Sequence, residues 1–492
     1  MGKKPTAFFW VATALLLFNL LVSNDYTTLW SGPESLLAWQ ALHAEAGPTL
    51  HEQLLASVGR PGAINLFLLR LPGVLVLSLS LLLFYVLLRP LLGRQHMANT
   101  LLLAAASLLI TNLAKVGAGD IWALSLQGIS LALLLRYLKQ PKRAWQLAFY
   151  LVFPLAIWVQ PLQSLIFLLG TAAYLYRLHP DGKQLARLNP WVSGLVAALG
   201  LYLLQWLDLP QYSFLIGWDT LTFLLVNAAG VLPFLGLVMA GIYESYKRSR
   251  QGEELALILS GAALFALLGH ALALQLVLAM IAGKQLKSYF AENYPYRNIV
   301  ITGTVLQLVA AACGLILFMM YIFVEFRGLG YRAALAAGGV YWMLSFVGVV
   351  GLLGKRELYA RTGIVFSGLL LTTLFWLQLN PLLESKRNWA ERLPAESREL
   401  KGVDADTECL VLPAEGTAFP NLAAYCKVQF TETVLVDSIG QLVASRQARP
   451  QTLCLLPEDA LEKTGLEVQD TARFEGWNNR LQPVIYRRLQ PE

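Results

Sequence analysis

A series of long apolar segments dominates this chain of 492 residues. They are rich in leucine, and about 20 apolar residues cross a 30 Å hydrocarbon layer as a helix. The segments lack the alternation of barrel strands, and inside a bilayer only helices and closed barrels satisfy the backbone. Charged residues make up 14% of the chain, whereas soluble domains contain about 25%. The sequence therefore predicts an all-α polytopic membrane protein.

Twelve apolar segments stand out, and a break in one of the longest would make thirteen. The predicted spans are 8–22, 64–88, 98–116, 121–137, 145–159, 162–177, 191–207, 219–242, 254–283, 298–326, 332–353 and 361–379. Segment 254–283 has a candidate break at Gly269-His270, and segment 298–326 has one at Gly314. Because the 354–361 loop is more basic than the 326–332 loop, it is expected to be cytoplasmic. A cytoplasmic 354–361 loop places the exit of the last span on the outer side, which favours thirteen spans over twelve.

Lysine and arginine recur after every second span and predict the orientation, because short cytoplasmic loops are enriched in them. The basic groups are Lys3-Lys4, Arg89/Arg94, Arg136 to Arg143, Arg177 to Arg187 and Lys247 to Arg250. The first segment is expected to be a retained anchor, since no clear cleavage pattern follows it. The predicted outer loops are residues 23–63, the turn ending at Asp120, the turn at 158–161, the stretch 205–220 and the stretch 284–297.

The composition changes near Leu383, where a charged, helix-favouring stretch is followed by short β-like runs between turn residues. We therefore predict a transmembrane domain over 1–382, with a first outer loop at 23–63, and a small α/β domain over 383–492 on the outer face. The α/β domain holds Cys409, Cys426 and Cys454, which allow at most one disulfide. Burial as small apolar side chains is the commoner state of such residues.

The chain lacks the signatures of the common soluble enzymes. It contains no phosphate-binding P-loop, no GxGxxG between strand and helix, no CxxC, no HExxH and no GxSxG at a strand end. The five histidines have no metal-ligand spacing. The net charge of +7 lies mostly in the predicted cytoplasmic loops and needs no nucleic-acid partner.

Five short motifs in the outer loops and their flanks together carry a resemblance. They are LWSGPESLLAW at 29–39, LLRLPG at 68–73, GDIWALSLQGISLALLL at 119–135, KQLKSYFAENYPYRNI at 284–299 and NPLLESKRNWAERL at 380–393. In order, spacing and topology they resemble integral-membrane glycosyltransferases of the GT-C superfamily. The nearest branch is that of the aminoarabinose transferases and protein O-mannosyltransferase-like enzymes. The resemblance extends over nearly the whole chain.

This resemblance implies transfer of a sugar from a polyprenyl-phosphate carrier to an envelope lipid, glycan or protein acceptor, in a bacterial-type inner membrane with the C-terminal domain in the periplasm. In such a reaction a carboxylate orients or deprotonates the acceptor, and cationic or amide donors stabilise the departing phosphate. The implied carboxylates are Glu34, Asp120 and Asp25, and the implied phosphate-binding residues are Arg60, Lys284, Lys287 and Tyr289. A divalent metal is compatible with the carboxylates, but no closer acidic cluster assigns one.

Departures from the family pattern leave a second interpretation open. Alignment of Leu29-Trp30 with the family's LW places Pro33 at the usual catalytic aspartate and Glu34 at the second acidic position. Proline cannot act as a base, so either Glu34 or Asp25 has taken the role or the chain has kept the fold without the reaction. In the latter case the protein would be a structural subunit of a membrane complex. A transporter is disfavoured by the polar first loop and the terminal domain.

Several of the candidate site residues also have a purely structural interpretation. Glu34 and Asp120 suit helix N-termini, where a carboxylate satisfies free N–H groups and the helix dipole. Lys284 and Lys287 suit anchors at a membrane interface.

Overall fold

The computed structural model describes residues 5–22, 59–60, 63–115, 120–189, 220–387 and 389–399, isolated positions between 192 and 199, and shorter stretches from 403 to 489. The chain divides into two compact units. The first comprises Met1–Val22, Gly73–Lys115 and Gly119–Leu379, and the second comprises Ser23–Pro72, Val116–Ala118 and Asn380–Glu492. Each unit is described on its own below.

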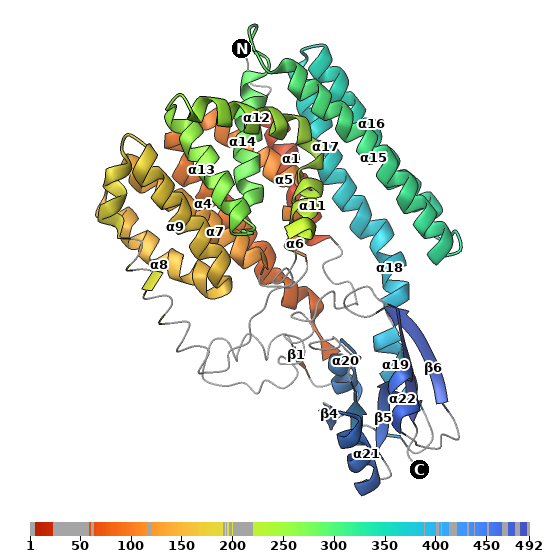
Figure 1. The fold of residues 1–492 in the computed structure, drawn as a ribbon. Helices are drawn as coiled ribbons and strands as arrows, with labels where there is room; N and C mark the ends of the chain where they lie inside the picture. Colours follow the sequence, from red (N-terminus) through yellow and green to blue (C-terminus); the bar gives the residue numbers. More distant parts are fainter. Residues whose placement is uncertain are drawn as a thin grey trace. The chain divides into compact units, whose positions relative to one another are not determined.

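The first unit is built from helices around a leucine-rich core, which confirms the predicted all-α membrane architecture (Figure 1). Its helices are α1 (Pro5–Leu21), α4 (Leu66–Leu92, which begins in the second unit), α5 (Arg94–Ala106), α6 (Leu108–Leu113), α7 (Asp120–Lys139), α8 (Arg143–Val159), α9 (Pro161–Leu178), α11 (Thr220–Gly230), α12 (Leu235–Ser249), α13 (Glu254–Leu268), α14 (Leu274–Ser288), α15 (Arg297–Glu325), α16 (Tyr331–Leu353) and α17 (Glu357–Leu374). Short 3₁₀ turns cover Gly182–Leu188 and Leu232–Phe234, and a π-helical turn, Phe375–Leu379, follows α17.

Several of these helices are long and apolar enough to cross a membrane. Among the described residues five qualify: α4, α7, α15, α16 and the continuous helix Glu357–Glu384. A sixth span results if α11 and α12, which bend by 58° at a short break, are taken together. Further apolar helices are shorter: Phe8–Leu21, Arg143–Val159 and Glu254–Leu268. The chain is a multi-pass membrane protein.

The predicted break at Gly269-His270 is confirmed, whereas the alternative break at Gly314 is wrong. Helix α13 ends at Leu268 and α14 begins at Leu274, with His270 at φ 50° between them. The His270 ring stacks on Phe223, and its Nε2 lies 3.3 Å from Thr220 Oγ1. Gly314 instead lies within the uninterrupted α15, with open space around it. The chain therefore reverses direction at residues 269–273.

This reversal overturns the prediction that stretch 284–297 is an outer loop. Lys284 Nζ lies 3.4 Å from carboxylate oxygens of both Glu244 and Glu253. These acids flank the basic group Lys247 to Arg250, which the charge pattern predicts to be cytoplasmic. The 284–297 stretch thus shares an end of the helical unit with the basic loops. We call this the basic end. A single uninterrupted span over 254–283 would have placed it at the other end.

Small residues let helices α16 and α17 approach closely. A Cβ added at Gly363 would lie 2.2 Å from Gly348 N, and one added at Gly351 would lie 2.3 Å from Ala360 N. Figure 1 shows α15 and α16 side by side, and a Cβ at Gly338 of α16 would collide with Leu315 of α15. Membrane helices associate through such close packing, because in lipid the hydrophobic effect does not drive one apolar helix against another.

The second unit contains the predicted α/β domain. Its five-stranded sheet has the order β4-β3-β5-β7-β6, with β3 parallel to both β4 and β5, and β7 antiparallel to β5 and β6. The strands are β3 (Cys409–Val411), β4 (Thr433–Leu435), β5 (Leu453–Pro457), β6 (Thr471–Trp477) and β7 (Pro483–Leu489). The helices are α18 (Asn380–Arg387), α19 (Trp389–Arg398), α20 (Asn421–Gln429), α21 (Ile439–Ala448) and α22 (Glu458–Thr464). A separate two-residue ladder joins β1 (Gly59–Arg60) to β2 (Ala63–Ile64).

The cysteines of this domain are buried and free, as small apolar core residues would be. Cys409 and Cys426 belong to one hydrophobic cluster and Cys454 to another. Burial raises the pKa of Cys454 to about 11, although the nearby Arg446 acts in the opposite direction. Burial raises the pKa of Cys426 as well. Thiols with a raised pKa are poor nucleophiles, so Cys426 and Cys454 are structural in the folded domain.

Candidate functional site

Asp120 is the first residue of α7, and its side chain is buried. Gln160 Nε2 donates a hydrogen bond to Asp120 Oδ1 over 3.2 Å. Gln160 is the residue between α8 and α9, directly before Pro161, which opens α9. The structure thus joins two turns that lie 40 residues apart in the sequence. The helix N-terminus also favours a negative charge at this position.

A chain of neutral side chains supports this contact from within the bundle. Gln127, two turns along α7, donates through Nε2 to Gln160 Oε1 at 3.3 Å and to Ser164 Oγ at 3.1 Å. Its Oε1 accepts a hydrogen bond from the Ala273 backbone N–H at 3.2 Å. Because all these groups are buried and partnered, Gln160 is held in one orientation toward Asp120. The break between α13 and α14 is therefore part of the support of Asp120.

Lys115 lies five residues before Asp120 and is also buried. Its Nζ donates to the Val22 carbonyl, at the exit of α1, and lies 5.0 Å from the centroid of the Trp376 ring. Trp376 Nε1 in turn donates to Asn112 Oδ1 at 2.6 Å. A buried cation thus lies at the end of the helical unit where α7 begins.

Sequence reasoning missed Lys115, Gln127 and Gln160. A signal for Lys115 was present, since a single lysine ends an apolar segment and only small residues separate it from Asp120. The two glutamines gave no such signal, because uncharged residues do not stand out in composition, either within a span, as for Gln127, or in a predicted turn, as for Gln160.

The predicted phosphate-binding residues Lys284, Lys287 and Tyr289 do not lie beside Asp120. At the far end of α7, about 28 Å away by helix rise, Lys139 pairs with Asp181 at 3.1 Å and with Glu254. Glu253, the next residue, pairs with Lys284. Tyr289 OH donates to Leu352 O at 2.9 Å. These residues therefore belong to the basic end.

The remaining predicted site residues belong to the first loop. Glu34 and Asp25 lie outside the described residues. Arg60 is described as part of the β1–β2 ladder, where it pairs with Ala63. Over the described ranges, no group of three or more His, Cys, Asp or Glu could hold a metal ion.

The fold has a close counterpart among solved structures. ArnT, an aminoarabinose transferase from Cupriavidus metallidurans solved bound to undecaprenyl phosphate, superposes with a TM-score of 0.67 at 15% identity, over 98% of both chains. Its apo structure gives 0.68 at 16% identity, over 99% of this chain and 98% of that one. The chain has the fold of the GT-C glycosyltransferases. No family model and no curated protein matches its sequence.

The fold shared with ArnT extends over 98% of the chain, since the superposition includes both units. The oligosaccharyltransferase AglB from Archaeoglobus fulgidus is a more distant match, with a TM-score of 0.47 at 12% identity over 92% of this chain and 69% of that one. At 15 and 16% identity the two ArnT structures show the shared fold alone, and individual residue roles rest on this chain's own geometry.

Proposed function

We propose that this protein is a membrane glycosyltransferase that moves a sugar from a polyprenyl-phosphate carrier to an envelope lipid, glycan or protein acceptor. The observation that carries the proposal is the shared fold, over 98% of both chains, with an ArnT structure bound to undecaprenyl phosphate. A carrier of this kind suits a multi-pass protein, because its lipid tail stays in the bilayer while its phosphate lies at the surface.

In the proposed reaction an acceptor oxygen attacks the anomeric carbon of the donor. The new C–O bond forms as the bond from that carbon to the phosphate oxygen breaks, and the electron pair stays on the phosphate. The acceptor proton passes to a carboxylate, for which Asp120 is the described candidate and Glu34 and Asp25 are the candidates in the first loop. Gln160 orients Asp120. Lys115 supplies positive charge at the same end of the bundle.

The proposed setting is a bacterial-type inner membrane with the basic end in the cytoplasm, because the basic loops gather there. The end that carries Asp120 then faces the periplasm, and the C-terminal domain is proposed to lie on that side. Polyprenyl-phosphate sugars and lipids are the proposed partners, with other membrane proteins as partners of a complex. A divalent metal is not part of the proposed mechanism.

The test is sugar release from a panel of radiolabelled polyprenyl-phosphate sugars by the purified protein. Asp120→Asn, Glu34→Gln and Asp25→Asn are assayed beside Asp181→Asn, a carboxylate variant at the basic end. Turnover that disappears in Asp120→Asn and persists in Asp181→Asn supports the proposed site. Turnover that survives Asp120→Asn but not Glu34→Gln or Asp25→Asn moves the base to the first loop.

Pro33, at the position of the family's usual aspartate, favours one alternative: a GT-C-fold subunit of a membrane complex without catalysis. That interpretation requires protein that folds and binds polyprenyl phosphate but releases sugar from no donor in the panel. The same assay therefore separates the enzyme from the structural subunit.

A further inference from the structure

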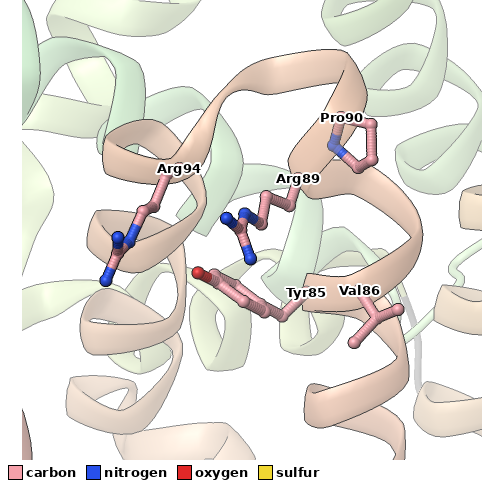
Figure 2. Close-up of a pocket in the computed structure, with 5 residues that line it drawn as sticks. All are labelled: Tyr85, Val86, Arg89, Pro90 and Arg94. Atoms are coloured by element: carbon pink, nitrogen blue, oxygen red, sulfur yellow. The ribbon is translucent and has the colours of Figure 1, made fainter.

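An open hollow of about 540 Å³ lies at the corner between α4 and α5, at the basic end of the helical unit. It is lined by Tyr85, Val86, Arg89, Pro90 and Arg94. Figure 2 shows the Tyr85 hydroxyl directed into the space between the guanidinium groups of Arg89 and Arg94. The Arg89 guanidinium carbon lies 6.0 Å from the centroid of the Tyr85 ring. Two cations and a phenol hydroxyl therefore converge on one hollow.

The positive charge of this corner is not balanced locally. The sequence contains no Asp or Glu between Glu52 and Asp120. Within the described part of the chain, no carboxylate pairs with Arg89 or Arg94, whereas Lys139, Arg248 and Lys284 at the same end all have acidic partners. The corner is thus a cationic hollow that an anion would complement.

The backbone of the corner also favours an anion. Arg94 opens α5, where the helix dipole disfavours a positive charge, and Gly93 before it supplies no capping side chain. Gly93 has φ 86°, and the space beside its Cα is open, since a Cβ placed there would have no heavy atom within 4 Å. An anion at this position would satisfy both the free N–H groups of the first turn and the two guanidinium groups.

An apolar stripe on α4 leads directly to the hollow. Leu75, Leu79, Leu82 and Val86 are 56 to 59% exposed. Their spacing of three and four residues puts them on one face of the helix, and Arg89 continues that face. From Leu75 to Val86 the stripe rises about 16 Å, half the thickness of a 30 Å hydrocarbon layer. The stripe thus matches the depth of one leaflet.

We propose that the α4–α5 corner binds the phosphodiester headgroup of an anionic glycerophospholipid from the leaflet at the basic end. The headgroup lies between Arg89 and Arg94 with the Tyr85 hydroxyl as a further donor, and an acyl chain lies along the stripe of α4. Basic pockets beside membrane helices are a known means of binding anionic lipids. The stripe distinguishes a lipid from free phosphate, because inorganic phosphate has no apolar part to cover Leu82 and Val86. The proposal does not depend on the transferase activity.

The test is native mass spectrometry of the full-length protein equilibrated with equal amounts of phosphatidylglycerol and phosphatidylcholine of identical acyl chains. We expect the unmodified protein to retain phosphatidylglycerol preferentially. Arg89→Gln/Arg94→Gln should lower that preference by about fivefold per arginine. The matched control is Lys142→Gln/Arg143→Gln, which removes two exposed charges at the start of α8, at the same end of the unit.

The control and competition arms decide the outcome. Equal loss of preference in both double variants, or no preference in the unmodified protein, overturns the proposal. Displacement of the lipid by inorganic phosphate alone would also overturn it and make the hollow a free-phosphate site. A photoreactive phosphatidylglycerol should cross-link to residues 85–94 of the unmodified protein, which keeps the test valid if the double variant does not fold. Cross-linking spread evenly over other helices would count against the site.

Discussion

The two ends of the helical unit hold their carboxylates in different ways. At the basic end, Glu244 lies 2.8 Å from Arg248 and 3.4 Å from Lys284, and Glu254 and Asp181 share Lys139. At the other end, Asp120 accepts a hydrogen bond from the neutral amide of Gln160, which is itself held by Gln127. The first arrangement is a network of charges, and the second includes a chain of amides.

This difference indicates that the two ends of the helical unit have different roles. A buried carboxylate paired with cations is costly to disturb, because removal of one partner leaves the others buried without compensation. An amide donor instead fixes the direction of a carboxylate through a hydrogen bond without adding a charge of its own. The basic end is therefore suited to holding helices together, and the oriented carboxylate of Asp120 suits the role of base in the proposed reaction.

The largest effect is expected for Asp120→Asn. This variant keeps the side-chain volume and removes the charge, so sugar transfer should fall by about 10²-fold or more, the usual contribution of a general base. The measurement is the rate of sugar release under saturating donor.

Asp181→Asn is the matched control, because it removes a carboxylate at the basic end from an ion pair with Lys139. We expect its transfer rate to stay within about twofold of the unmodified protein, since exposed ion pairs contribute little. Equal loss of activity in both variants would mean that the two ends do not differ in the way proposed.

The next largest effect is a loss of stability in Glu244→Gln. The Glu244 side chain is 4% exposed and Arg248 is 40% exposed, so the cost should lie below that of a fully buried pair. We expect the free energy of unfolding to fall by about 2 kcal/mol with an unchanged transfer rate per folded molecule. Glu396→Gln is the control, because Arg392 and Glu396 are 62% and 42% exposed in their pair, and it should cost less than about 1 kcal/mol. Similar losses in the two variants would argue against a special role of the network.

Two glutamines sharpen the comparison further. Gln160→Leu removes the donor to Asp120 and should lower the rate about tenfold through misorientation, with little change in the KM of the donor. Gln285, which donates to Glu244 at the basic end, serves as the counterpart. Gln285→Leu should lower the unfolding temperature and leave the rate of the folded protein unchanged. A rate loss in Gln285→Leu would contradict the assignment.

The sequence predicted the architecture well because long apolar segments leave a membrane chain few alternatives. The helical unit, the C-terminal α/β domain and the break at Gly269-His270 all followed from patterns within single segments. The predicted placement of Lys284, Lys287 and Tyr289 was wrong because the outer loops were predicted with 254–283 as one span, and a reversal at Gly269-His270 exchanges the ends of every later helix. The contact between Asp120 and Gln160 could not be predicted, because it depends on the packing of α7 against the α8–α9 turn.

The smallest expected effect concerns the pH dependence of the basic end. Burial alone would raise the pKa of Glu253, but the hydrogen bond from Arg248 and the charges of Lys284 and Arg248 outweigh it and lower that pKa. A lowered pKa in the folded state means that Glu253 stabilises the fold above its unfolded value of about 4.3. This stabilisation is lost as the pH falls through the lower pKa of the folded state.

The difference in unfolding temperature between the unmodified protein and Glu253→Gln should thus be constant above about pH 5 and shrink below about pH 4.3. Because the carboxylate is 36% exposed, the difference should correspond to less than about 1 kcal/mol. A difference that instead grows with acidification would show that Glu253 is not held as a paired anion, and that the basic end is joined by fewer charges than its geometry indicates.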